Sequence, residues 1–484
     1  MDFKQSKKLI RRTALFYWIL AIVVYLVSYH QFRYSDAETD MPSPNGNVGE
    51  IIDGQRIEQT VVFDGDTITS IDVMAATYQR QNTGSLIIRL IDSEGNELTS
   101  ETADVNVFAD NGNTVIKFDR LVRVEKGEKI TVLFETEGSE SGKAITLLSG
   151  NSADAGRTSI PLSISDKNSA KVDGNAIGSL LCFELIGYSE INFYLSYWYI
   201  VVIAFAVVSI AVYIWWKQAK KGKNNPLVAI CTMLTKYRFL ISQLVSRDFK
   251  TKYKRSVLGV AWSFLNPLLT MLVQYIVFST LFNSDIPNYP VYLLTGIVFM
   301  NFFNEAVSMS MTSITGNAPL IKKVYMPKYI YPISRVLSSL VNFSFALIPL
   351  FLFIAITGAG FHASLLLLVF DLLCLLGFIT GMALLLTTAM TFFQDTQFLW
   401  SVVSMMWMYL TPVFYPETII PSQFETLYHM NPMYQYITFA RICIIDGHSP
   451  APAAYLWCII SSAVILLLGI LAFRKHQDEF ILYL

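Results

Sequence analysis

Residues 237–267 read YRFLISQLVSRDFKTKYKRSVLGVAWSFLNP, and they lead from a basic segment into an apolar one. At helical spacing, one face of the first half collects the apolar residues Ile241, Leu244, Val245, Phe249 and Tyr253. The opposite face is polar and mostly basic, with Gln243, Arg247, Lys250 and Lys254. This pattern predicts an amphipathic helix over 237–254 that lies along the inner membrane surface. A lipid-anchored linker would show the same pattern, so the helix alone does not indicate a function.

The composition of the whole chain is typical of a protein solvated largely by lipid. Of its 484 residues, 53% are hydrophobic and only 15% are charged, whereas soluble domains carry about 25% charged residues. Apolar runs of roughly 20 residues, a length that crosses a bilayer, recur through the second half. We therefore expect contact with membrane lipid and no nucleic-acid partner.

Two apolar runs bracket a polar region in the N-terminal half. The first, 14–29, follows a cluster of Lys and Arg and lacks the small-x-small pattern of a cleavage site, so we interpret it as an uncleaved anchor. The second, 197–216, precedes a segment up to residue 255 that is rich in Lys and Arg and whose only acid is Asp248. Because Lys and Arg are enriched in cytoplasmic loops, both basic ends are predicted to be cytoplasmic and the region between the runs extracytoplasmic.

The region between these runs has the pattern of an all-β domain. Short β-rich runs alternate with turn signals such as Asp64-Gly65 and Lys126-Gly127. The predicted strands are 58–63, 71–78, 86–91, 114–118, 129–135, 145–149 and 180–186. This spacing predicts a β-sandwich, jelly-roll-like in architecture, whose length suffices for a core of its own. Its role stays open between recognising a glycan, binding a cell-wall component and docking another protein.

Six further apolar runs complete the predicted topology, and they cover 258–282, 291–313, 329–357, 364–391, 398–414 and 454–473. The segment 417–452 is rich in Pro and Gly yet too apolar for a free loop, which predicts short re-entrant helices. The predicted fold is an α-helical polytopic membrane protein of about eight transmembrane helices with an extracytoplasmic all-β sandwich. Its parts are 1–34 (cytoplasmic N-terminus and first anchor), 35–190 (β-sandwich), 191–217 (second transmembrane helix), 218–256 (basic linker and amphipathic helix) and 257–484 (six-span core).

Several motifs resemble those of ABC-2 type transporter permeases, in particular the polysaccharide and teichoic-acid (O-antigen) exporters. The first motif runs from Arg247-Asp248-x-Lys250 through Ser256-x-Leu258-Gly259 and Trp262 to Asn266-Pro267. The others are NAPLIKKVYMP at 317–327, TPVFYP at 411–416 and NPMY at 431–434, followed by Arg441. The chain departs from the family at Gln394-Asp395, where members usually carry Arg-Asp, and in its first 220 residues, which precede the six-span pattern.

The resemblance implies a set of partners and a substrate. The permease should pair with a second copy of itself and with two copies of a cytoplasmic ABC ATPase. It should export a lipid-linked polysaccharide of the O-antigen, capsule or teichoic-acid type across the bacterial cytoplasmic membrane, with both termini cytoplasmic. The residues expected to couple to the ATPase are Arg247, Asp248, Lys250, Lys252, Leu320, Ile321, Lys322, Lys323 and Tyr325.

The energy source is expected to lie outside this chain. A P-loop needs the spacing G-x-x-x-x-G-K-[ST] so that backbone amides surround the phosphates. The nearest match, GSESGKA at 138–144, is one residue short, lacks the Ser or Thr for Mg²⁺ and falls in the β region, so it predicts a hairpin turn. We expect no cofactor in this chain, no enzymatic activity, and ATP and Mg²⁺ on the partner ATPase.

Aromatic and acidic residues in the apolar runs are further candidates. Trp262, Tyr275, Trp407 and Tyr409 are candidates for a glycan path, because aromatic rings stack on sugar faces, although rings at membrane interfaces are ordinary. Glu305 and Asp371 are acids inside apolar runs, where charge is costly. We expect them to make helix–helix or protomer contacts, with a role in the pathway as the second interpretation.

Two alternatives stay open from the sequence. An ABC-2 permease can also export a smaller amphiphile such as a drug or glycolipid. A membrane-anchored glycan-binding receptor is the alternative from another class, but a receptor needs only one or two spans.

Overall fold

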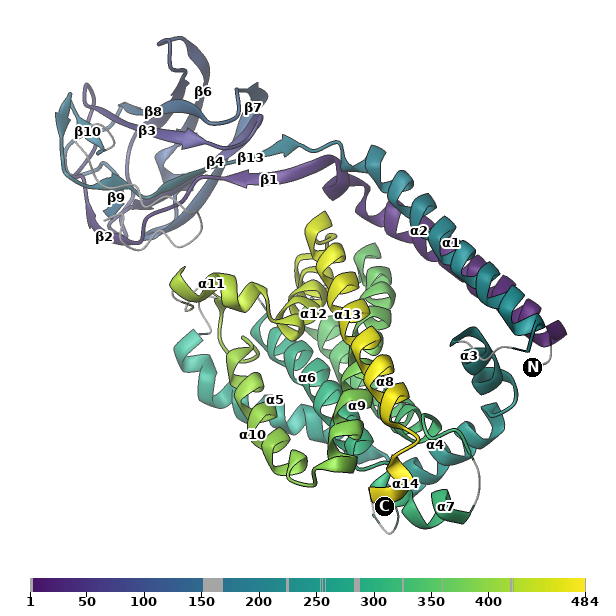
Figure 1. Cartoon of the computed structure of the whole chain (residues 1–484). Helices are drawn as coiled ribbons and strands as arrows, with labels where there is room; N and C mark the ends of the chain where they lie inside the picture. The colour runs from purple at the N-terminus through teal and green to yellow at the C-terminus, as the bar shows by residue number, and fades with distance from the viewer. Residues whose placement is uncertain are drawn as a thin grey trace. The chain divides into compact units, whose positions relative to one another are not determined.

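The computed structural model describes residues 3–150, 169–222, 226–252, 254, 256, 258–282, 288–323, 326–358, 360–417, 420 and 422–483. The chain forms two compact units. One unit, Phe32–Asn192, is built from strands, and the other, Met1–Gln31 with Phe193–Leu484, is built from helices (Figure 1). Each unit has its own core, so each is described separately.

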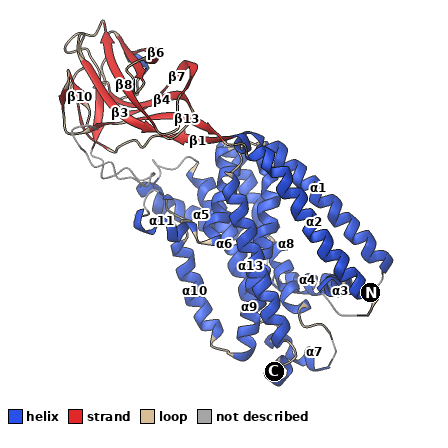
Figure 2. Cartoon of the chain, turned by 45° about the horizontal axis from the view of Figure 1, so that its top comes forward, coloured by secondary structure: helices blue, strands red, loops and turns tan. Residues whose placement is uncertain are grey.

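The β unit contains two antiparallel sheets, drawn in red in Figure 2. The first follows the order β1 (Tyr34–Glu38), β13 (Phe183–Glu190), β4 (Thr67–Ala76), β9 (Thr146–Gly150) and β12 (Leu180–Leu181), with β2 (Pro44–Asn47) on β9 and β7 (Gly112–Arg123) on β4. The second follows the order β11 (Asn175–Ala176), β10 (Lys171–Val172), β3 (Arg56–Phe63), β8 (Glu128–Glu137), β5 (Ser85–Ile91) and β6 (Glu97–Asp104).

The two sheets share one hydrophobic core. Ile57, Ile88 and Ile130 from the second sheet are fully buried in the same cluster as Ile71 and Phe183 from the first. Along β5, buried side chains alternate with half-buried ones, as the period of two of a strand requires. The predicted β-sandwich is therefore confirmed, and each predicted strand has a counterpart.

Strands β1 and β13 are the first and last strands of the β unit. They pair antiparallel from Tyr34 opposite Glu190 to Glu38 opposite Ile186. The chain therefore enters and leaves the sandwich on neighbouring strands of one sheet. Strand β1, with the sequence YSDAE, and strand β6, with the sequence ELTSETAD, were not predicted because their residues show no apolar alternation.

Seven helices in the described part of the chain are long and apolar enough to cross a membrane. They are α1 (Phe3–Arg33), α2 (Phe193–Lys220), α5 (Ala261–Phe282), α6 (Tyr289–Met311), α8 (Ile330–Thr357), α9 (Leu368–Phe392, continuing from the short η4, Ala363–Leu367) and α13 (Pro452–His476). The remaining predicted span, 398–414, corresponds to α10 (Thr396–Leu410), which has 15 residues. At a rise of 1.5 Å per residue it is about 22 Å long, shorter than the ~30 Å hydrocarbon core of a bilayer.

Helix α6 lies at the centre of the helical unit, and most of its residues are buried. It packs on α5, α8 and α9, while α9 packs along α13. Gly381 on α9 makes this last contact close, since a Cβ there would collide with the carbonyl group of Ile465 on α13. Small residues at such positions let the backbones of membrane helices approach one another.

Short helices fill the segments between the long ones. They are η3 (Thr315–Asn317), α3 (Pro226–Thr235), α4 (Arg238–Lys252), α7 (Ala318–Lys323), α11 (Ser422–His429), α12 (Pro432–Arg441), η6 (Ile442–Asp446) and α14 (Phe480–Tyr483). Helices α11, α12 and η6 fall in the segment for which short helices were predicted. Helix α3 falls in the segment predicted as a linker.

Helices α1 and α2 form an antiparallel hairpin. The Tyr17 hydroxyl donates a hydrogen bond to the Val201 carbonyl (2.8 Å), and the Tyr197 hydroxyl donates one to the Ala21 carbonyl (2.7 Å). Ser28 on α1 hydrogen-bonds the hydroxyl of Tyr455 on α13 (2.8 Å), in a buried position. This bond attaches the hairpin to the other helices.

Candidate functional site

The amphipathic helix predicted over 237–254 is present as α4, and its apolar face is covered by protein. Ile241 and Leu244 are buried against Ile330 of α8, and Leu337, about two turns further along α8, packs on the same cluster. The side chains of Arg247 and Lys250 remain exposed. Helix α4 therefore packs on α8, which distinguishes it from a linker anchored only by lipid.

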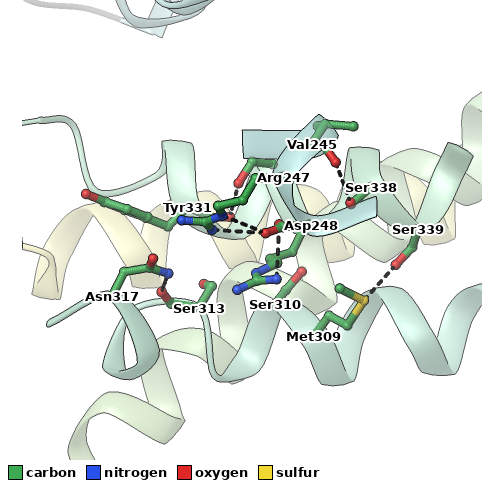
Figure 3. A network of polar contacts seen from close by, with 12 residues as sticks. Val245, Arg247, Asp248, Met309, Ser310, Ser313, Asn317, Tyr331, Ser338 and Ser339 are labelled. Carbon is green, nitrogen blue, oxygen red and sulfur yellow. Dashed lines mark hydrogen bonds and ion pairs between the residues drawn. The ribbon is translucent and has the colours of Figure 1, made fainter. Parts of the chain in front are cut away.

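Asp248 fixes α4 to α8 through ion pairs. Its carboxylate is 3.0 Å from Arg335 Nη1 on α8 and 2.9 Å from Arg247 Nη2 on its own helix. Figure 3 shows Arg247 directed at Asp248, next to a hydrogen bond from the Ser338 hydroxyl to the Val245 carbonyl. Only 3% of the Asp248 side chain is exposed, so this residue faces the interior of the chain. Asp248 is one of the residues expected to couple to an ATPase, but in the structure it holds α4 against α8.

Lys252, the last residue of α4, reaches a different helix. Its Nζ is 2.8 Å from Glu305 Oε1 on α6, and the Asn342 side chain on α8 donates a hydrogen bond to the same oxygen. Glu305 therefore joins three helices, α4, α6 and α8. The geometry is a helix–helix contact, in line with the first interpretation of this acid.

A cleft of about 400 Å³ opens beside this contact. Its lining comes from the end of α4 and from α5, α6 and α8, and it includes Lys252, Trp262, Ser263, Asn266, Asn301, Phe302, Asn304, Glu305, Ser339, Asn342 and Phe343. Most of its polar groups are neutral amides and hydroxyls. The Oδ1 atom of Asn304 is buried and has no hydrogen-bond partner among the described residues. Such a lining can bind a polar ligand through hydrogen bonds, ring stacking and one ammonium group.

The four aromatic candidates do not gather in one place. Trp262 is 44% exposed and lines the cleft. Tyr275 packs against the ring of Tyr289, with 6.1 Å between centroids. Trp407 donates a hydrogen bond from Nε1 to Asn431 Oδ1 (2.8 Å), and Tyr409 is exposed on α10. Trp262 is therefore the candidate that lines the cleft, and Trp407 holds α10 to the Asn-Pro segment.

The second predicted coupling segment, α7, is anchored by its apolar residues. Ile321 is buried in a cluster that contains Phe473 and Phe480, and Leu320 packs half-buried at its edge. Of the residues expected to couple to an ATPase here, Leu320 and Ile321 are thus turned partly or fully inward, while Lys322 and Lys323 are exposed. Tyr325 lies outside the described residues.

Lys328, which follows α7, links this segment to the C-terminal residues. Its ammonium donates a hydrogen bond to the Gln477 carbonyl. Burial lowers the pKa of Lys328 below its usual value, because desolvation disfavours the charged form. The α7 segment and the C-terminal residues therefore form one packed corner.

Arg441, which follows the NPMY motif, is a buried charge. Its guanidinium lies over the Tyr292 ring, 3.3 Å from the centroid, and donates to the carbonyls of Pro412 (2.7 Å) and Val413 (3.0 Å). Gly296 on α6 leaves room for it, since a Cβ there would be 2.8 Å from Nη2. This arginine ties the break after α10 to α6 and α12. The sequence signal that could have identified this buried residue is an arginine between the apolar runs 398–414 and 454–473.

Asp371 lies in the first turn of α9 and is fully buried. Neither carboxylate oxygen has a hydrogen-bond partner within the described ranges. The structure thus places it inside the helical unit and away from the cleft.

The turn that resembles a P-loop binds the chain's own carboxylates. The amide of Gly142 donates to Glu50 Oε2 (2.7 Å), and the amide of Ser139 donates to Asp53 Oδ1 (2.8 Å). Hydrogen bonds from the Arg80 side chain and from the Gly142 amide lower the pKa of Glu50. The amides of Ser139 and Gly142 are therefore not available to a phosphate. The segment is a turn, but it joins β8 to β9, which belong to different sheets, so the predicted hairpin is wrong. The described residues also contain no group of three His, Cys, Asp or Glu placed to hold a metal.

Comparison with known proteins finds one matching family model and several similar export or transport proteins. A model of the family described as "ABC-2 type transporter" matches residues 239–445. The chain is 30% identical over 247 residues to "O-antigen export system permease protein RfbA" of Klebsiella pneumoniae, covering 93% of that protein and 50% of this chain. It is 28% identical over 259 residues to the protein of the same name from Myxococcus xanthus, covering 98% of it and 52% of this chain. It is 21% identical over 243 residues to "Polysialic acid transport protein KpsM" of Escherichia coli, covering 93% of it and 49% of this chain.

Proposed function

Because this chain belongs to the ABC-2 type transporter family as a membrane permease subunit, we propose that it exports a lipid-linked polysaccharide. The glycan would be of the O-antigen, capsule or teichoic-acid type, and the membrane would be the bacterial cytoplasmic membrane. Two similar proteins are named for O-antigen export and a third for polysialic acid transport, which supports a polymeric glycan.

The cleft beside α4 is the observation that carries this proposal. A sugar offers hydroxyls for hydrogen bonding and an apolar face for stacking, and the cleft presents amides of Asn266, Asn301 and Asn304 together with the exposed Trp262. Its volume of about 400 Å³ lies within the usual range for ligand pockets. The cleft thus offers a place for the sugar next to the lipid.

Energy would come from partner subunits. ABC-2 permeases work with ATPase partners, and their membrane subunits lack ATPase activity. We assign the contact surface to the exposed side chains of Arg247 and Lys250 on α4 and of Lys322 and Lys323 on α7. The complete transporter would contain two copies of this chain and two copies of the ATPase, with ATP and Mg²⁺ on the ATPase.

Helix α4 provides a route from the ATPase to the cleft. It is held to α8 by Asp248 and Arg335 and to α6 by Lys252 and Glu305. A push on the exposed face of α4 would therefore move helices that line the cleft. In this topology the basic ends of α1, α2 and α13 lie in the cytoplasm, and the β unit lies outside.

The decisive experiment is disruption of the gene in its native host, with measurement of surface polysaccharide and of lipid-linked polysaccharide inside the cell. We expect the surface polymer to disappear and the lipid-linked polymer to accumulate at the inner leaflet. Purification of the chain from the host should recover an ABC ATPase, identified by mass spectrometry. Unchanged surface polysaccharide, or recovery of a monomer without an ATPase, would contradict the proposal.

A further inference from the structure

Helix α4 has two charged attachments, and they differ in their access to solvent. The Asp248–Arg335 ion pair is shielded from solvent, because the Asp248 side chain is only 3% exposed. The Lys252–Glu305 ion pair is accessible to solvent, because these side chains are 38% and 30% exposed and both line the cleft. The two attachments lie four residues, or about one helical turn, apart on α4. A ligand in the cleft can therefore reach the second attachment without disturbing the first.

In the solvent-accessible Lys252–Glu305 pair, Lys252 can bind an anion in place of the Glu305 carboxylate. A lysine ammonium has three donors and no fixed geometry, so it binds a phosphate as readily as a carboxylate. A partly exposed ion pair is weak, because water screens the attraction between its charges. A phosphate that enters the cleft also repels the Glu305 carboxylate. Phosphate binding and release of Glu305 would then favour each other.

The rest of the lining indicates what accompanies the anion. Asn266 and Asn301 offer neutral hydrogen-bonding groups, and the buried Oδ1 atom of Asn304 lacks a partner among the described residues. Trp262 adds an exposed ring on the same cleft. A sugar carrying a phosphate matches this combination, whereas a lipid tail would leave the amides unbonded.

We propose that this cleft binds the phosphorylated end of a lipid-linked glycan and that the phosphate takes Lys252 from Glu305. This inference rests on the proposed function and adds the recognition of the phosphate and its consequence. The exchange frees the end of α4 from α6, while Asp248 keeps the helix attached to α8. Occupancy of the cleft thereby changes the position of the helix that faces the ATPase. Since coupling between two sites is reciprocal, ATPase-driven movement of α4 also changes the affinity for the phosphate.

The test uses the purified full-length chain in phosphatidylcholine nanodiscs, with binding measured by native mass spectrometry. The probes are a polyprenyl diphosphate, the matching uncharged polyprenol, inorganic pyrophosphate and phosphatidylglycerol. We expect the diphosphate to bind more tightly than the polyprenol and more tightly than phosphatidylglycerol. Phosphatidylglycerol binding as tightly as the diphosphate would overturn the inference, because the cleft would then be a general phospholipid site. Inorganic pyrophosphate should compete with the diphosphate, and failure to compete would also count against the inference.

Variants of the two residues should act in opposite directions. Lys252→Gln should weaken diphosphate binding about tenfold, the usual effect of one lost charge-assisted hydrogen bond. Glu305→Gln should strengthen it several-fold, because the competing carboxylate is gone. Lys252→Arg should keep most of the affinity, and Lys254→Gln is the matched control, since Lys254 is exposed two residues further along the chain and does not line the cleft.

Two results separate failure of this inference from failure of the proposed function. If Glu305→Gln weakens binding as Lys252→Gln does, in protein that elutes and melts like the wild type, the exchange is wrong. If the diphosphate binds but neither variant changes its affinity, the phosphate lies elsewhere, which overturns the inference and leaves the export function standing. Export itself is measured independently as surface polysaccharide in the host.

Discussion

Replacement of Asp248 by Asn tests whether this residue holds α4 in place. The substitution keeps the shape of the side chain and removes its charge. At about 4 Å between charge centres and an effective dielectric constant of about 20, each of its two ion pairs contributes roughly 4 kcal/mol before desolvation. Arg335 is 25% exposed, so its pair counts nearly in full, whereas Arg247 is 46% exposed and its pair is screened. Desolvation of the carboxylate offsets several kcal/mol of the sum.

We therefore expect Asp248→Asn to lower the free energy of local opening of α4 by about 2–3 kcal/mol, below the ~3–5 kcal/mol typical when one partner of a fully buried pair is removed. In hydrogen exchange of the purified protein, this corresponds to about 30- to 150-fold faster exchange of the α4 amides. Amides of α9 and α13, which do not contact Asp248, should be unchanged.

The control for this experiment is Lys250→Gln, which alters an exposed residue of the same helix and should leave exchange unchanged. The double variant Asp248→Asn with Arg335→Gln should be destabilised by less than the sum of the two single effects, because neither Asp248 nor Arg335 is then left as a charge without its partner. Exchange of α4 at the wild-type rate in Asp248→Asn would refute the assignment of Asp248 as the residue that fixes this helix.

Four further outcomes are expected. Gly296→Ala should lower the melting temperature, since its Cβ would lie 2.8 Å from a buried guanidinium, whereas Gly316→Ala, with open space around the glycine, should not. Trp262→Ala should reduce surface glycan at an unchanged amount of permease in the membrane, while Trp407→Ala should reduce that amount, as measured by immunoblot. The lowered pKa of Glu50 means that its contribution to stability is present above the unfolded pKa near 4–4.5 and is lost as the pH falls through the folded value, so in calorimetry Glu50→Gln should flatten the acid dependence of β-unit melting. Excision of the β unit should leave a helical unit that still inserts and still co-purifies with an ATPase, and an aggregated product would contradict the separation of the two cores.

Local patterns in the sequence were sufficient to predict most elements of both units. The alternation along β5 and the helical spacing of Ile241, Leu244 and Val245 each depend on residues a few positions apart. Strand β6 was missed because its sequence, ELTSETAD, shows no apolar alternation, and only Thr99 among its residues is buried. The length of α10 was overestimated, since the apolar run continues through Pro412 after the helix has ended.

The candidate site was less predictable because its contacts join distant residues. The sequence marks Lys252 as basic and Glu305 as an unusual acid, but no periodicity connects two residues 53 positions apart. Asp248 was expected among the residues that couple to an ATPase, but its pairing with Arg335 shows that it faces α8. Of four aromatic candidates of the same chemistry, Trp262 lines the cleft, and this distinction depends on the packing of α5, α6 and α8.

The antiparallel pairing of β1 with β13 also has an evolutionary meaning. Because Tyr34 lies opposite Glu190, the sandwich is inserted into the chain at what is in effect one point, and its two ends are separated only by the spacing of neighbouring strands, ~5 Å. A domain whose two ends lie close together can be inserted into a chain, or removed from it, without separating the flanking segments. Related permeases with different sandwiches, or with a tight turn in place of one, are therefore the natural variants to seek among genomes.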